Sequence, residues 1–159
     1  MKGFVQLNQS QISILINVFS NVLNLIQGPP GTGKTYLSSF ITYNLFLFRK
    51  DKTEKILLYA SSNSGSDNLA LNLLKLYNAL GGKMNILRIY AKSREILPIK
   101  DELLRISLHN ILEEHQEDEI KEKKDLINEI IDKADIVITT CSTSWDDRLK
   151  GIFFSFCFN

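Results

Sequence analysis

Residues 28–35 read Gly28-Pro29-Pro30-Gly31-Thr32-Gly33-Lys34-Thr35. They fit the pattern Gly-x-x-x-x-Gly-Lys-Ser/Thr, in which the backbone N–H groups of a glycine-rich loop surround a phosphate. An apolar run, residues 22–26, stands before the loop, and a stretch without Gly or Pro, residues 34–48, follows it. Strand, loop and helix in that order are the context that the pattern requires, so the sequence predicts a phosphate-binding loop. The alternative is an incidental loop at the start of a helix.

Each residue type of the loop has a chemical reason. Gly31 and Gly33 allow backbone N–H groups to approach an anion closely, and the helix that follows adds the partial positive charge of its N-terminus. We expect Lys34 to neutralise the β- and γ-phosphate oxygens and the charge that develops during transfer. The Thr35 hydroxyl is expected to ligate Mg²⁺. All eight residues are therefore candidate nucleotide contacts, with Lys34 as the catalytic group and Thr35 as the metal ligand.

Outward from the loop, strands and helices alternate. Asn8 with Gln11 three residues later matches a capping box at the start of a helix. The predicted strands are 22–26, 56–60, 86–90, 136–140 and a final apolar segment within 151–159 that suits a central strand. The predicted helices are 34–48, a stretch from about 69 that ends at Gly81, and an acidic pair at about 101–115 and 119–133. This order predicts an α/β fold with a mostly parallel sheet, helices on both faces and an inserted helical hairpin.

Composition narrows the class further. The chain has a formal net charge of +1, and 44% of its residues are hydrophobic, which indicates an ordinary folded domain and excludes disordered and fibrous classes. No apolar run approaches the length that spans a bilayer. Cys141 and Cys157 have neither metal-ligand nor disulfide spacing, which favours an intracellular location. Residues 71–100 are basic and 101–135 acidic, which fits either a rim that meets phosphates or two solvated faces.

One part expected of a phosphate-transferring enzyme is missing. Phosphoryl transfer requires an acidic pair that holds Mg²⁺ and orients the attacking water, commonly at the end of an apolar strand. No apolar strand of this sequence ends in Asp-Glu, and the strand 136–140 is followed by Cys141. We therefore predict that this chain binds a nucleotide without efficient hydrolysis.

Three further motifs accompany the loop. Leu7-Asn8-Gln9-Ser10-Gln11 ends seventeen residues before Gly28, Ala60-Ser61-Ser62-Asn63 is followed by Asp67 and Leu69, and Ala134-Asp135-Ile136-Val137-Ile138-Thr139-Thr140-Cys141 comes later. With these motifs the chain resembles, over nearly its whole length, the up-frameshift family of superfamily 1 helicases, the nonsense-mediated decay type. The resemblance implies a RecA-like P-loop NTPase domain, ATP and Mg²⁺ as cofactors, and single-stranded RNA or DNA as the partner.

The resemblance also implies roles for individual residues. Gln11 would read the adenine edge and select ATP, although the capping box alone also accounts for it. Ser62, Asn63 and Thr140 would contact the nucleic-acid backbone, whereas a plain polar turn is the other interpretation. Residues 142–145 depart from the glycine-containing version of the family. Trp145 either packs against the rest of the protein or stacks on a base of the nucleic acid.

The domain organisation follows from the same resemblance. Residues 1–159 would form a partial first motor domain with 93–134 as an inserted helical segment, and Asn159 falls where the magnesium-holding aspartate would stand. The second motor domain would be absent, so unwinding by this chain alone is not expected. In an intact protein the partners would be that second domain and decay-pathway proteins, in the cytoplasm or alternatively in the nucleus. A ring-forming P-loop ATPase and a non-functional truncated product are the rival interpretations. Ser-Asn in place of Asp-Glu after the strand 56–60 favours the helicase.

Overall fold

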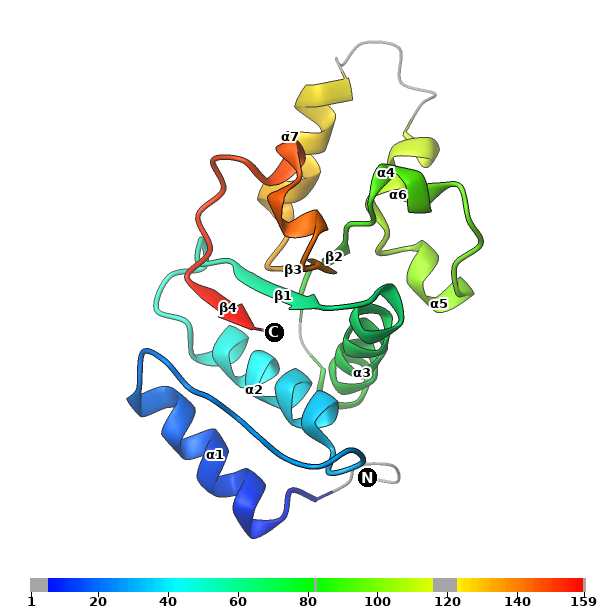
Figure 1. The fold of residues 1–159 in the computed structure, drawn as a ribbon. Coiled ribbons are helices and arrows are strands. Elements are labelled where there is room, and N and C mark those ends of the chain that lie inside the picture. The colour runs from blue at the N-terminus through cyan, green and yellow to red at the C-terminus, as the bar shows by residue number, and fades with distance from the viewer. Residues whose placement is uncertain (1–5, 82, 116–122, 159) are drawn as a thin grey trace.

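The computed structural model describes residues 6–81, 83–115 and 123–158. Within them four parallel strands form a sheet in the order β2-β3-β1-β4 (Figure 1). The strands are β1 (Ile56–Ala60), β2 (Ile86–Arg88), β3 (Ile136–Thr140) and β4 (Phe156–Phe158). Ala60 pairs with Thr140 across β1 and β3, so the residues that follow both strands come together at the carboxyl edge of the sheet.

The sheet is covered by helices on both faces. The helices are α1 (Gln9–Ser20), α2 (Lys34–Phe48), α3 (Asn63–Leu80), α4 (Lys92–Glu95), α5 (Asp101–Leu104), α6 (Leu108–Glu114) and α7 (Lys123–Lys133), with 3₁₀ turns η1 (Thr143–Trp145) and η2 (Asp147–Leu149). Figure 1 shows α1 and α2 on one side of the sheet and α7 on the other. The predicted α/β class with a parallel sheet between two helical layers is confirmed.

Alternation along the strands divides the core into two parts. Ile56 and Leu58 of β1 pack with α2 and α3, whereas Leu57 between them packs with α6 and α7. Successive side chains of a strand point to opposite faces, and each fully buried aliphatic side chain contributes about 1.5–3 kcal/mol. The two cores together fix the strands whose carboxyl ends carry the candidate site. No helix of the described residues is long and apolar enough to cross a membrane.

The prediction of a strand at residues 22–26 is wrong. The segment is extended but outside the sheet, and Val22, Leu23 and Leu25 are exposed. The Asn24 side-chain amide donates to the carbonyl oxygens of Val18 at 3.4 Å and Asn21 at 3.0 Å, which ties the segment to the end of α1. A strand requires a hydrogen-bonding neighbour, and here a side-chain amide bonds the nearby carbonyls instead.

Three other predictions differ from the structure: the unbroken helix at 101–115, the end of the strand 86–90 and the central position of the last strand. The helix expected at 101–115 is broken, because the Arg88 N–H donates to the Ile106 carbonyl at 2.7 Å and Ser107 bridges to Arg88. That bridge holds extended backbone between α5 and α6, and β2 itself ends at Arg88 rather than at Tyr90. The second acidic helix is described from Lys123 onward, and the rest of that prediction lies outside the described residues. Strand β4 lies at the edge of the sheet, not at its centre, since β1 is its neighbour in the described sheet.

Candidate functional site

The glycine-rich loop has the backbone conformation that its glycines permit. Gly31 and Gly33 have φ angles of 80° and 79°, in the left-handed region that costs other residues about 1–2 kcal/mol. Gly33 is also the N-cap of α2, and its carbonyl accepts the first helical hydrogen bond from Leu37 at 2.9 Å. The loop therefore turns directly into a fifteen-residue helix whose N-terminal N–H groups favour an anion.

The loop closes on itself through its side chains. The Lys34 ammonium donates to the carbonyl oxygens of Gly28 at 2.6 Å and Pro29 at 2.7 Å, and the Thr32 hydroxyl donates to the Pro29 carbonyl at 2.9 Å. A Cβ at Gly28 would lie 3.0 Å from the Thr32 hydroxyl oxygen, so a side chain there would require the Thr32 side chain to shift. Lys34 is exposed, so its ammonium lies over the loop with its charge accessible.

Gln11 contacts this loop from α1. Its amide nitrogen donates to the Thr32 carbonyl at 3.2 Å, while its amide oxygen accepts from the Asn8 N–H at 3.0 Å. Asn8 in turn accepts from the Gln11 N–H at 2.9 Å, so the predicted capping box is present. The same side chain thus caps α1 and reaches the loop. An amide keeps a second N–H and a second lone pair when each end makes one bond, so it retains the capacity to pair with a base edge.

Substituting Gly33 is expected to damage both the loop and this contact. Gly33→Ala places a methyl group in the left-handed region, with its carbon 3.2 Å from the Gln11 amide nitrogen. We expect a loss of about 1–2 kcal/mol in the free energy of unfolding, measured by urea denaturation, and weaker nucleotide binding. Gly151→Ala is the matched control for the contact and for nucleotide binding: its φ of 80° imposes the same backbone strain, but nothing lies within 4 Å of the added carbon, so it should lose similar stability and leave nucleotide binding unchanged. A Gly33→Ala variant as stable as the wild type would contradict the strained loop.

Thr35 stands next to Lys34 in the first turn of α2 and is exposed. Its hydroxyl is the loop's candidate ligand for Mg²⁺, since hard cations prefer oxygen ligands. Among the residues that the structure describes, no group of three His, Cys, Asp or Glu side chains is placed to hold a metal ion. A divalent cation at the loop would therefore depend on Thr35 and on the oxygens of a bound phosphate.

The three predicted nucleic-acid contacts gather at the carboxyl edge of the sheet, but in different environments. Ser62 is the N-cap of α3, where its hydroxyl accepts from the Gly65 N–H at 3.1 Å. Asn63 is half-buried in the first turn of the same helix. Thr140 is only 6% exposed, and its hydroxyl lies 2.9 Å from that of Thr143. Ser62 and Asn63 are accessible to a ligand, whereas Thr140 supports the turn that follows β3. Contact of any of the three with nucleic acid stays a prediction.

A buried arginine organises this edge, although both interpretations of the basic stretch 71–100, a rim that meets phosphates and a solvated face, place its cations at the surface. Arg88 is fully buried; its Nε donates to Asp67 at 2.9 Å and its Nη2 donates to the Asn63 amide oxygen at 3.0 Å. Its guanidinium lies 3.9 Å from the centre of the Tyr90 ring. The Tyr90 hydroxyl also donates to Asp67 at 2.9 Å, and burial raises the pKa of Tyr90 to about 12. Arg88 therefore holds Asp67 and Asn63 in place from the interior and is not exposed to a ligand at the surface.

The sequence did contain a signal for this network. Arg88 stands inside the apolar run 86–90, and a charge in a buried strand must be paired. Asp67 is in the first turns of α3, the helix that follows β1. In a parallel sheet the carboxyl ends of all strands lie at one edge. The last residue of β2, Arg88, therefore lies near the start of α3, the helix that follows β1 and holds Asp67. The pair could have been proposed from that rule.

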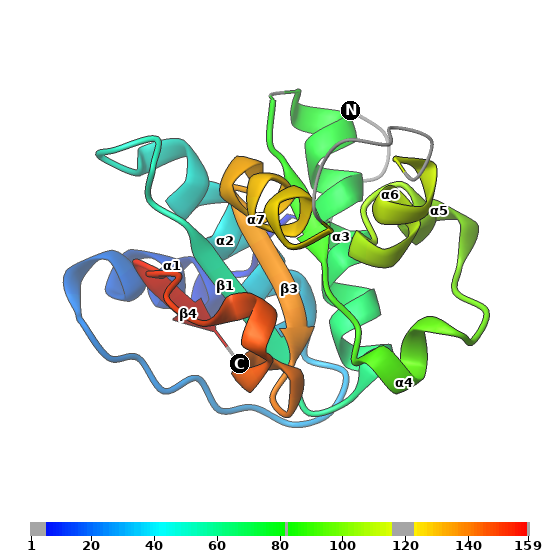
Figure 2. The same cartoon turned by 90° about the horizontal axis from the view of Figure 1, so that it is seen from above.

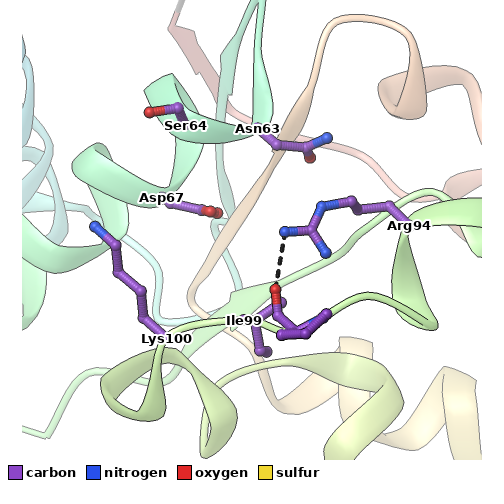
Figure 3. A pocket seen from close by; sticks show the side chains of 7 residues that line it. Asn63, Ser64, Asp67, Arg94, Ile99 and Lys100 are labelled. Carbon is purple, nitrogen blue, oxygen red and sulfur yellow. Dashed lines mark hydrogen bonds between the residues drawn. The ribbon is translucent and has the colours of Figure 1, made fainter.

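A pocket of about 380 Å³ opens beside this network (Figure 3). It is lined by Asn63, Ser64, Asp67, Arg94, Pro98, Ile99 and Lys100. The Arg94 guanidinium donates to the carbonyl oxygens of Leu97 at 3.0 Å and Pro98 at 3.1 Å, which shapes the wall after α4. In Figure 3 the side chains of Arg94 and Lys100 border the start of α3 from the α4–α5 segment. Two cations therefore lie beside the exposed start of a long helix.

Comparison with known proteins places these features in a family. Residues 6–124 match the family described as an AAA domain. The ATP-dependent helicase NAM7 of Saccharomyces cerevisiae is 35% identical over 173 residues, which cover 95% of this chain and 17% of that protein. Regulator of nonsense transcripts 1 of Caenorhabditis elegans is 31% identical over 94% of this chain and 15% of its own length. The ATP-dependent helicase upf1 of Schizosaccharomyces pombe is 34% identical over 70% of this chain and 12% of its own length. The chain thus spans 12–17% of the length of these relatives.

Proposed function

This chain belongs to the AAA domain family, in its up-frameshift-like helicase branch, and from that membership we propose that it is the ATP-binding part of a helicase motor that acts on single-stranded RNA or DNA. The observation that carries the proposal is the loop at residues 28–35. Its two left-handed glycines, the Lys34 ammonium and the start of α2 all belong to one turn of chain. Backbone N–H groups, a fixed cation and a helix N-terminus are the groups that bind a polyphosphate.

The loop supplies binding and charge neutralisation rather than covalent chemistry. Lys34 would exchange the Gly28 and Pro29 carbonyls for the β- and γ-phosphate oxygens, which are stronger acceptors because they are charged. Thr35 would ligate the Mg²⁺ that accompanies ATP and neutralises the charge that develops in phosphoryl transfer. The Gln11 amide, already at the Thr32 carbonyl, would pair with the adenine edge. The nucleotide would then be held at both of its ends.

Turnover is a separate matter from binding. No strand of the described residues is followed by an Asp-Glu pair; β3, for example, leads into Cys141 and Ser142. Without a carboxylate to orient the attacking water, bound ATP would persist. We therefore propose that this 159-residue chain binds ATP and Mg²⁺ but neither hydrolyses ATP efficiently nor unwinds a duplex by itself.

The proposal is tested by titrating the purified chain with fluorescent ATP, with and without Mg²⁺, and by measuring ATP turnover with poly(U) present. Saturable binding that Mg²⁺ strengthens, without turnover, is the expected result. Turnover that RNA stimulates would contradict the proposed inactivity. An absence of nucleotide binding in a folded sample would overturn the assignment of the loop.

Removal of the Gln11 amide is expected to blunt the preference for ATP over GTP. If the amide pairs with adenine, Gln11→Ala should lower the ratio of ATP to GTP affinity about fivefold to tenfold, the equivalent of about one hydrogen bond. Asn8→Ala is the matched control, since it breaks the same capping box but leaves the Gln11 side chain present. That control should lower helix stability by about 1 kcal/mol without changing selectivity. Equal selectivity in all three proteins would leave Gln11 with its capping role alone.

A further inference from the structure

Trp145 is the single tryptophan of the sequence and ends the turn η1, where it is 88% exposed. A lone exposed apolar side chain is common at protein surfaces and indicates nothing by itself. Its setting is what distinguishes this one. The indole lies five residues after β3, at the carboxyl edge of the sheet that also carries Ser62 and Asn63.

The backbone beneath the indole is held in place. The Thr143 and Thr140 hydroxyls lie 2.9 Å apart, the Ser144 hydroxyl donates to the Cys141 carbonyl at 2.7 Å, and the Asp146 N–H donates to the Thr143 carbonyl at 3.0 Å. Thr143 and Ser144 of η1 and Asp146 after it are therefore each held by a hydrogen bond. A preformed turn loses little conformational entropy when its exposed side chain binds a ligand.

Arg148, three residues after Trp145, joins this turn to the neighbouring elements. Arg148 donates from Nε and Nη2 to the Asp146 carboxylate at 2.8 and 2.9 Å, from Nη2 to the Tyr90 carbonyl at 2.7 Å, and from Nη1 to Glu95 of α4. These bonds also lower the pKa of Asp146. Figure 2 shows the turn after β3 beside the end of the sheet, on the same side as α4. The turn that carries Trp145 is thus tied to Tyr90 and to α4, the helix whose Arg94 lines the pocket of about 380 Å³.

The charges around Trp145 favour an anionic ligand. The neighbouring acids are paired: Asp146 with Arg148, and Asp147 with Lys150 at 2.6 Å. Lys92 in α4 is exposed and close enough to act on the Asp146 carboxyl. Arg94 and Lys100 follow at the pocket that Asn63 also lines. Three cations, Lys92, Arg94 and Lys100, therefore lie on the segment that runs from α4, which Arg148 ties to this turn through Glu95, to the pocket at the start of α3.

We propose that Trp145 is a stacking platform for an unpaired base of single-stranded nucleic acid, with the phosphates of that strand beside Lys92, Arg94 and Lys100. Bases present a π-face whatever their identity, so stacking tolerates any sequence but requires a base that is not buried in a duplex. The cations would follow the sugar-phosphate backbone without reading sequence. The proposal rests on the proposed function, because it names how the same motor domain would hold its strand.

The test uses the chain's own fluorescence, because Trp145 is the only indole. The purified chain is titrated with poly(U) and, separately, with an abasic ribose-phosphate oligomer of similar length, while fluorescence anisotropy of the labelled polymer reports binding. We expect poly(U) to quench the tryptophan emission on binding and the abasic oligomer to leave it nearly unchanged. Quenching of equal size by both polymers would overturn stacking.

Variants separate stacking from charge. Trp145→Ala should weaken poly(U) binding about tenfold, Trp145→Phe should retain much of the affinity, and neither should change ATP binding. Phe48→Ala is the control, because Phe48 is an exposed aromatic at the far end of α2 from the loop. Unchanged poly(U) affinity in Trp145→Ala, with binding intact in the wild type, would overturn this proposal and leave the proposed function standing. If the wild type binds ATP but no polymer, both the platform and the nucleic-acid part of the proposed function are wrong.

Discussion

Arg88→Met is expected to lower the free energy of unfolding by about 3–5 kcal/mol, the largest stability change of any single substitution that we propose. The substitution keeps an unbranched side chain of similar length but removes the charge that faces Asp67, whose side chain is only 13% exposed. Asp67 would then keep the Tyr90 hydroxyl as a partner while its negative charge is uncompensated. Breaking a buried ion pair by removing one partner is far more damaging than losing an exposed pair. Urea denaturation followed by circular dichroism measures the change.

Two further variants make this result interpretable. Arg88→Met combined with Asp67→Leu should recover part of the loss, because the unpaired carboxylate is no longer present. Lys133→Met removes a cation from an exposed pair with Glu129, where the lysine side chain is 70% exposed, and should change the free energy of unfolding by less than about 0.5 kcal/mol. If Arg88→Met behaves like Lys133→Met, the buried network is not a determinant of stability.

The Arg88 network also connects the stability of the fold to the pocket at the start of α3. Asn63 and Asp67, which line the pocket, are the residues that the buried guanidinium holds. A ligand at the start of α3 would therefore contact side chains whose positions Arg88 of β2 already holds. Preorganised groups lose less side-chain entropy on binding, which would benefit this surface in the proposed binding of a single strand.

The sequence predicted those elements whose signals are local. The helix α2 and the strands β1 and β3 have the predicted bounds, since apolar runs framed by Gly, Asn and charged residues define them. The capping box of Asn8 and Gln11 is present because it depends on residues three positions apart. The loop glycines with positive φ were expected for the same reason.

The failures concern features that depend on distant partners. Residues 22–26 are apolar enough for a strand, but no sequence pattern reveals whether a neighbouring strand will offer its edge. The break at Ile106 depends on the Arg88 N–H, eighteen positions earlier in the chain. Arg88 itself pairs with Asp67 across 21 positions. In the first two cases the tertiary environment overrides a local periodicity, whereas the third could have been inferred from the charge inside an apolar strand.

The contact between Gln11 and the loop is an intermediate case. The resemblance to the helicase family implied that Gln11 lies at the nucleotide, and the structure brings its amide to the Thr32 carbonyl. Whether it reads adenine stays a prediction, because the same amide also completes the capping box. Only the selectivity measurement with Gln11→Ala and Asn8→Ala separates the two roles.

Lys34→Ala is expected to weaken ATP binding on the order of 100-fold, because it removes a cation that would make about two charge-assisted hydrogen bonds to the phosphates. Stability should change little, since the lysine is exposed and its present acceptors, the Gly28 and Pro29 carbonyls, become accessible to water. Fluorescent-ATP titration with Mg²⁺ measures the affinity, and urea denaturation checks the fold.

Lys50→Ala is the matched control, because it removes the same charge from an exposed lysine just beyond the opposite end of α2. Its ATP affinity should equal that of the wild type. A uniform loss in both variants would indicate that net charge, rather than the loop, governs binding. If Lys34→Ala retains full affinity while folded, the phosphates lie elsewhere, and residues 28–35 are no more than a glycine-rich helix start. A selective loss in Lys34→Ala would instead place the phosphates at this loop, where the Lys34 ammonium would exchange its two carbonyl partners for phosphate oxygens.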